Sequence, residues 1–113
     1  MGANFEPGSS HVAHVQVTNK ARKPYNYRLT FMLTSDYAAI VPQVLGYKNI
    51  SLEAGESGVI DMEITFWGFE VLTYLQISGY EETTETPLGV LYEEEVNLEI
   101  VSQPEASITL YWD

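Results

Sequence analysis

Residues 25–34, YNYRLTFMLT, decide the fold class of this chain. Large apolar or aromatic side chains occupy every second position, and mostly polar side chains stand between them. The first set is Tyr25, Tyr27, Leu29, Phe31 and Leu33. Because successive side chains of a β-strand point to opposite faces, this alternation predicts a strand with one buried and one solvated face.

The same period of two recurs along the chain, at residues 13–17, 60–66, 96–100 and 108–112. Turn-forming residues separate these runs, and no segment keeps a period of 3.6 residues. The expected strands cover residues 11–18, 25–34, 44–52, 59–66, 69–78, 90–101 and 107–112, and residues 79–89 are expected to form a polar acidic loop. About seven or eight short strands with distinguishable faces predict an all-β, immunoglobulin-like antiparallel β-sandwich. We expect residues 1–10 to form a flexible leader and residues 11–113 to form the single domain.

Charge is unevenly distributed in the 113-residue chain, whose net charge is −11. All five basic residues lie in the first 48 positions, whereas residues 49–113 carry fourteen acidic residues and no basic one. This distribution argues against nucleic acid and anionic membranes as partners, because both require a broad basic surface. The basic turn formed by Lys20, Arg22 and Lys23 is instead a candidate contact for the acidic edge of a protein partner or of a second copy.

Several classes of site are disfavoured by the residue types. The chain has no cysteine, so it has no disulfide, thiolate metal site or cysteine nucleophile. His11 and His14 are three positions apart on an expected strand, which places them on opposite faces and prevents joint metal binding. No serine lies in a nucleophile motif, and no apolar run reaches the length of about 20 residues that spans a bilayer. We therefore predict no catalytic activity, no metal, no cofactor and no direct membrane insertion.

Two alternatives remain for the acidic and aromatic residues. Glutamates 81, 82, 85 and 93–95 suggest a calcium-dependent adhesion domain. Adjacent glutamates of a strand point to opposite faces, however, and Glu94 is expected at a bulge or an edge where it blocks pairing.

Exposed aromatic side chains suggest a carbohydrate-binding module, the candidates being Tyr37, Tyr47, Trp67, Tyr74, Tyr80 and Tyr92. Trp67 and Phe69 flank Gly68 at an expected strand junction, and both are candidate binding residues. Tyr25, Tyr27, Phe31 and Phe66 fall on the inward register.

Two segments carry a family resemblance: HVQVTNKARKPYNYRLTFML (14–33) and ISLEAGESGVIDMEITF (50–66). They resemble bacterial immunoglobulin-like accessory domains, most closely the C-terminal domain of the FixG family of cytochrome-oxidase assembly proteins, over residues 12–66. The resemblance implies a sandwich in which Asn19 bonds its own backbone at the turn, and it favours an extracytoplasmic or cell-surface location. It supplies no catalytic residue. The expected function is a non-catalytic interaction or structural module that makes protein contacts within a larger assembly or parent protein, through an exposed strand edge or the loops between the sheets.

Overall fold

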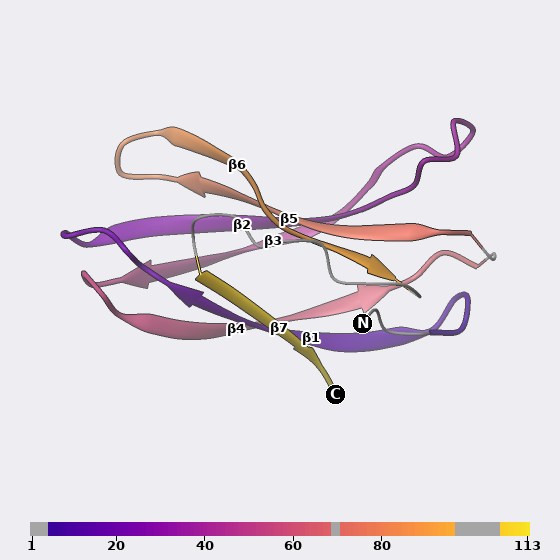
Figure 1. Cartoon of the computed structure of the whole chain (residues 1–113), viewed down its shortest axis with the longest axis horizontal. Coiled ribbons are helices and arrows are strands. Elements are labelled where there is room, and N and C mark those ends of the chain that lie inside the picture. The colour runs from indigo at the N-terminus through magenta and orange to yellow at the C-terminus, as the bar shows by residue number, and fades with distance from the viewer. Residues whose placement is uncertain (1–4, 69–70, 97–106) are drawn as a thin grey trace.

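The computed structural model describes residues 5–68, 71–96 and 107–113, and these residues form a β-sandwich of seven strands without a helix (Figure 1). This confirms the predicted all-β class and the predicted number of strands. The strands are β1 (Ser10–Thr18), β2 (Tyr25–Thr34), β3 (Gln43–Leu52), β4 (Ser57–Thr65), β5 (Thr73–Glu81), β6 (Thr86–Val96) and β7 (Ser107–Trp112).

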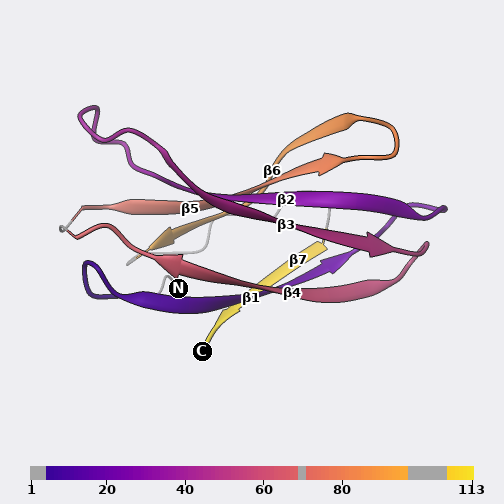
Figure 2. The same cartoon turned by 180° about the vertical axis from the view of Figure 1, so that it is seen from behind.

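The strands form two antiparallel sheets that pack face to face. One sheet has the order β4-β1-β7 and the other has the order β3-β2-β5-β6. Figure 2 shows the two layers from behind, with β3 and β4 at the same side of the sandwich. The molecule is elongated, with extents of 43 × 26 × 22 Å, and the strands run along its length. Loops and turns therefore gather at two well-separated ends.

The alternating residues fill the space between the sheets. On β2, Leu29, Phe31 and Leu33 are completely buried, and on β1 the same holds for Ala13 and Val15. Strands β4 and β5 contribute further buried residues, which are Ile60, Met62, Ile64, Leu75 and Ile77. Because two apolar strand faces can be shielded from water only by facing each other, the period of two dictates the two-layer arrangement.

The predicted acidic loop over residues 79–89 is wrong. Strand β5 continues to Glu81 and β6 starts at Thr86, so only residues 82–85 form the turn of a β-hairpin. Glu85 adopts a left-handed backbone conformation with φ of 54° in this turn. The expected strand over residues 69–78 correspondingly begins later, at Thr73, and the predicted strand residues 97–101 lie outside the described residues. The many polar residues of this segment predicted a loop, but residues of a paired strand can also be polar where they face solvent.

Two register shifts in the β5–β6 ladder alter which side chains of β6 point inward. They fall between Ile77 and Ser78 and between Gly79 and Tyr80 of β5. As a result, the consecutive residues Leu91 and Tyr92 are both buried. Gly79 makes room for this arrangement: a Cβ atom at this position would lie 2.5 Å from Cδ1 of Leu91.

Glu94 is also buried, so the prediction that it protects a bulge or an edge is wrong. Its side chain is 2% exposed and accepts hydrogen bonds from Nε1 of Trp112 at 2.9 Å and from the Tyr92 hydroxyl at 3.3 Å. Burial raises the pKa of Glu94, although the two hydrogen bonds partly oppose that shift. Glu94 therefore joins the edge of one sheet to β7 of the other.

The expected leader covers residues 1–10, of which residues 5–10 are described. The Phe5 ring contacts the rings of His11, Phe66 and Trp112, with centroid distances of 4.2, 4.9 and 4.7 Å. The Gly8 amide donates to the Trp67 carbonyl, and β1 begins at Ser10. Through these contacts, the described part of the N-terminal segment packs against the core.

Candidate functional site

The basic turn lies between β1 and β2, and buried Asn19 fixes its shape. Oδ1 of Asn19 accepts a hydrogen bond from the Ala21 amide at 2.8 Å, which is the predicted backbone bond of this turn. Its Nδ2 donates to the Lys23 carbonyl at 3.0 Å and to the Leu52 carbonyl at 3.2 Å. Because the Asn19 side chain is completely buried, these bonds hold the turn firmly against the β3–β4 connection.

A groove of about 970 Å³ opens between this basic turn and the β5–β6 hairpin. Both segments lie at the left end of the molecule in Figure 1. Apolar and aromatic side chains from β1, β2 and β6 form most of the walls, and lysine, threonine and glutamate side chains supply polar atoms. The lining residues are Val17, Thr18, Lys20, Ala21, Tyr25, Tyr27, Glu81, Thr84, Thr86, Leu88, Val90 and Leu91.

Glu81 fixes the hairpin wall of the groove. One carboxylate oxygen accepts hydrogen bonds from the Thr84 amide at 2.6 Å and the Thr84 hydroxyl at 2.8 Å. The other accepts from the Asn26 amide at 2.7 Å. Burial raises the pKa of Glu81, but these N–H and O–H donors outweigh that effect and lower it to about 2. An ionised Glu81 therefore ties the β5–β6 turn to the start of β2.

Two tyrosine rings form the wall contributed by β2. The rings of Tyr25 and Tyr27 meet edge to face with centroids 6.2 Å apart, and the Lys23 ammonium lies 5.8 Å from the centroid of Tyr25. Both side chains are half-buried, in agreement with their predicted inward register. Burial and the negative charge of Glu81 raise the pKa of the Tyr27 hydroxyl, so this hydroxyl stays protonated and can donate a hydrogen bond into the groove.

The charge around the groove is mixed. Lys20, Arg22 and Lys23 are on the basic turn, and four glutamates are on the two neighbouring turns at residues 53–56 and 82–85. Backbone hydrogen bonds join the basic turn to the first of these turns, since the Gly55 amide donates to the Asn19 carbonyl and the Asn19 amide donates to the Glu56 carbonyl. Lys20 is the basic residue that lines the groove itself.

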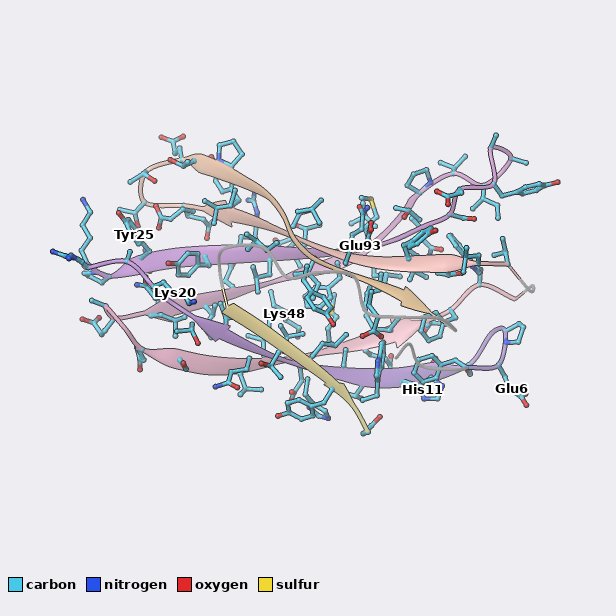
Figure 3. All side chains as sticks on the ribbon, in the orientation of Figure 1. Glu6, His11, Lys20, Tyr25, Lys48 and Glu93 are labelled. Carbon is cyan, nitrogen blue, oxygen red and sulfur yellow. The ribbon has the colours of Figure 1, made fainter. Side chains whose placement is uncertain are left out.

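Trp67 lies at the opposite end of the sandwich from the basic turn. Figure 3 labels Lys20 and Tyr25 near one end and Glu6 and His11 near the other, where the backbone contact between Gly8 and Trp67 is found. Trp67 packs against the core, and its Nε1 donates to the Thr73 hydroxyl at 2.9 Å. Phe69, the other aromatic candidate, lies outside the described residues. The structure therefore does not bring Trp67 and the basic turn into one site.

The aromatic side chains considered for carbohydrate binding are dispersed. Tyr92 is in the core with 1% exposure, which excludes it from a surface platform. Tyr37 is on the β2–β3 connection, and the Tyr74 hydroxyl donates to Asp36 at 2.8 Å. Tyr47 and Tyr80 approach the same cation, Arg28, on the outer face of the four-stranded sheet.

The acidic residues considered for calcium point to different places. Glu81 accepts hydrogen bonds from backbone and hydroxyl donors, and Glu82 lies 3.7 Å from Arg28. Glu93 accepts a hydrogen bond from Gln76, and Glu94 is buried and bonded to Trp112.

The two histidines lie on opposite faces of β1. The His11 ring packs against Phe5, while Nδ1 of His14 is hydrogen-bonded to Asp61 at 2.7 Å. Within the described ranges, no group of three or more His, Asp or Glu residues converges as a metal site would require. The part of the chain that the structure describes also contains no helix that could cross a membrane.

Sequence reasoning identified Lys20 but missed most of the groove. The sequence pattern places Leu88 in the expected loop and Val90 at the start of the next expected strand, and it groups Glu81 with the other acidic residues. A usable signal was present, because large apolar residues at positions 88, 90 and 91 are unusual in a solvated acidic loop. The inward register of Tyr27 was correct, but its contact with the β5–β6 hairpin depends on strand order, which the alternation does not specify.

Comparison with known proteins supports the fold. No family model matches the chain, and no curated protein matches it. Among solved structures, a β-glucosidase from Listeria innocua in complex with glucose is similar with a TM-score of 0.58 and 17% sequence identity. The match covers 88% of this chain and 15% of the glucosidase chain. At this identity the likeness concerns the sandwich fold alone.

Proposed function

We propose that this chain is a non-catalytic binding module that holds an extended apolar segment of a protein partner in the groove between the basic turn and the β5–β6 hairpin. The observation that carries the proposal is the groove itself, which has apolar walls and a volume of about 970 Å³. Concave, largely apolar sites with a few placed polar groups are typical of ligand recognition.

Exposed apolar side chains at the rim favour a partner that enters from solvent. Leu88 and Val90 are 38% and 47% exposed although both line the groove. They belong to β6, an outer strand of the four-stranded sheet, so a partner segment can reach the groove along the side of the sandwich. Covering these side chains would remove apolar surface from water and supply the main favourable term of binding.

Charge and hydrogen-bond donors favour a segment with a carboxylate. Lys20 offers an ammonium group at the groove, and Tyr27 offers a hydroxyl that remains protonated. Arg22 and Lys23 add positive charge on the same turn, while the glutamates of the neighbouring turns repel a highly acidic partner. The preferred segment therefore alternates apolar residues with a single aspartate or glutamate that meets Lys20.

We further propose that the sandwich is of the immunoglobulin-like type and that it works outside the cytoplasm, as the resemblance of residues 12–66 implies. The strand order supports the first point. Strand β1 lies between β4 and β7, β2 lies between β3 and β5, and the chain passes between the sheets after β1, β3, β4 and β6. Such exchanges between two antiparallel sheets are typical of the immunoglobulin fold.

A selection from a display library of random linear peptides, with the purified full chain as the target, tests the proposed function. We expect enrichment of peptides that alternate apolar residues and carry one carboxylate. The variants Lys20→Glu and Leu88→Asp should each weaken binding of the enriched peptides by about tenfold or more. Absence of any enriched pattern would contradict the proposal.

Two matched variants separate a groove from general effects of charge and polarity. Lys48→Glu makes the same charge change on β3, and Val59→Asp places a carboxylate at a position of β4 that is 53% exposed. Both should bind the peptides as the original chain does, and all four variants should keep the original thermal transition. Equal loss of binding in the groove variants and the control variants would show that the groove is not the binding site.

A further inference from the structure

A second surface, on the outer face of the four-stranded sheet, places one cation between two aromatic rings. Arg28 of β2 pairs with Tyr80 on β5, and the neighbouring outward residue Thr30 pairs with Tyr47 on β3. Strands β3 and β5 flank β2, so the two rings stand on either side of Arg28. Tyr47 is 61% exposed, which leaves its ring open to solvent.

Ring contacts and an acidic neighbour position the guanidinium group. Cζ of Arg28 lies 4.6 Å from the centroid of Tyr80 and 5.9 Å from that of Tyr47. One of its terminal nitrogens is 3.7 Å from a carboxylate oxygen of Glu82. A guanidinium group has five N–H donors in a plane, so these neighbours orient it without using all of its donors.

Small neutral polar side chains surround this cluster on the same face. The strand register places Thr30, Asn49 and Ser78 next to Arg28 or one outward position away. At the neighbouring outward position, Asn26 accepts a hydrogen bond from the Ser51 hydroxyl at 2.6 Å and donates to the Thr83 hydroxyl at 3.1 Å. The surface therefore combines flat rings with hydroxyl, amide and guanidinium groups.

We infer that this cluster, the tyrosine–arginine platform of Arg28, Tyr47 and Tyr80, binds a neutral oligosaccharide. Sugar rings have an apolar C–H face that stacks on aromatic rings and hydroxyl groups that exchange hydrogen bonds with amides and guanidinium groups. A neutral ligand is favoured because Glu82 already balances the charge of Arg28, and Glu93 adds a negative charge to β6 of the same sheet. The inference is independent of the proposed peptide groove, which opens between the sheets.

Titration of the isotope-labelled full chain with neutral hexasaccharides tests the platform. The probes are linear β-glucan, α-glucan, xylan and mannan hexasaccharides at millimolar concentration, followed by amide chemical shifts. At least one probe should shift the amides of Arg28, Tyr47 and Tyr80 and leave those of Leu88 and Val90 unchanged. Shifts at the groove instead of the platform, or no shift with any of these probes, would overturn the inference.

A pair of tyrosine variants gives the matched control. Tyr47→Ala should weaken binding of the active hexasaccharide by about tenfold, since it removes one stacking ring. Tyr37→Ala removes a ring of similar exposure, 63%, from the β2–β3 connection and should leave the affinity unchanged. Arg28→Lys should also weaken binding, because an ammonium group does not reproduce the planar set of donors. Equal loss in Tyr37→Ala and Tyr47→Ala would refute the platform, whereas the peptide selection would be unaffected.

Discussion

The indole Nε1 of Trp112 donates a hydrogen bond of 2.9 Å to the buried carboxylate of Glu94 and so connects the two sheets. Trp112 is on β7 of the three-stranded sheet, and Glu94 is on β6 of the four-stranded sheet. The ion pairs found among the described residues do not involve Glu94. Its carboxylate is therefore held by neutral donors, so its ionisation opposes folding.

Replacing Glu94 with glutamine should stabilise the protein at neutral pH. The amide keeps an acceptor for Trp112 and gains a donor for the Tyr92 hydroxyl, and it removes a buried charge. We expect the melting temperature to rise by about 4 °C, the change that about 1 kcal/mol produces in a domain of this size. Glu93→Gln, which alters the outward-facing neighbour bonded to Gln76, should change it little.

The pH dependence of unfolding should identify Glu94 as the source of this effect. Burial raises its pKa above the ordinary value of 4.5, so the folded state binds the proton more tightly than the unfolded state. The corresponding stability is present in full below pH 4.5 and is lost as the pH rises through the raised pKa. Urea titrations across this range should show that slope in the original chain and a smaller slope in Glu94→Gln. Identical slopes would contradict the assignment.

The link between Trp112 and Glu94 can be measured with a double-mutant cycle. Trp112→Phe removes the Nε1 donor and leaves the carboxylate with one hydrogen bond fewer, which should cost about 1–3 kcal/mol of unfolding free energy. The same substitution in the Glu94→Gln background should cost less, because an unpaired amide is less unfavourable than an unpaired charge. Equal costs in both backgrounds would show that Trp112 acts through packing alone.

Gly79→Ala should destabilise the β5–β6 hairpin. A Cβ atom at this position approaches Cδ1 of Leu91 to 2.5 Å, so the buried Leu91 side chain must shift, at a cost of about 1–3 kcal/mol. At Gly68, by contrast, a Cβ atom meets nothing within 4 Å. Denaturant unfolding of the two alanine variants should therefore show a loss at position 79 and little change at position 68. Similar losses at both positions would show that the contact with Leu91 does not determine the effect.

Glu81→Gln should destabilise the protein at neutral pH, and the stability difference from the original chain should disappear at acidic pH. The hydrogen bonds to Glu81 lower its pKa to about 2 in the folded state, from an ordinary value of 4.5. The stability that its ionised form provides is complete above pH 4.5 and is lost as the pH falls towards 2. Thermal melting at a series of pH values should show the original chain and the variant converging over this range. A constant difference down to pH 2 would contradict the role of the charge.

The sequence predicts the fold well wherever strands pair without irregularity. Strand β7 extends over residues 107–112 as predicted, and β1 extends over Ser10–Thr18, where residues 11–18 were predicted; the ladders of β1 with β4 and β7 contain no register shift. The alternation does not predict the inward side chains of β6, because two register shifts allow the neighbours Leu91 and Tyr92 to point inward together. Alternation assumes one residue for each step of the ladder, and a bulge breaks that assumption.

The candidate site was less predictable than the fold, because it is built from segments that are far apart in the sequence. The basic residues and the turn at Asn19 are local features, and both were predicted. The groove depends on the approach of the β5–β6 hairpin to the start of β2, which is fixed by the contact of Glu81 with the Asn26 amide, 55 positions away in the chain. Likewise, the contact of Glu94 with Trp112 joins two sheets, and no local pattern predicts which strands meet.

The most direct test of the central claim is an amide chemical-shift map of the labelled chain saturated with a peptide enriched in the display selection. If the groove holds an extended apolar segment, the largest shifts will fall on Lys20, Tyr27, Leu88 and Val90, which line it. Shifts concentrated at Trp67 at the opposite end, or on the outer-face residues Tyr47 and Tyr80, would contradict the account.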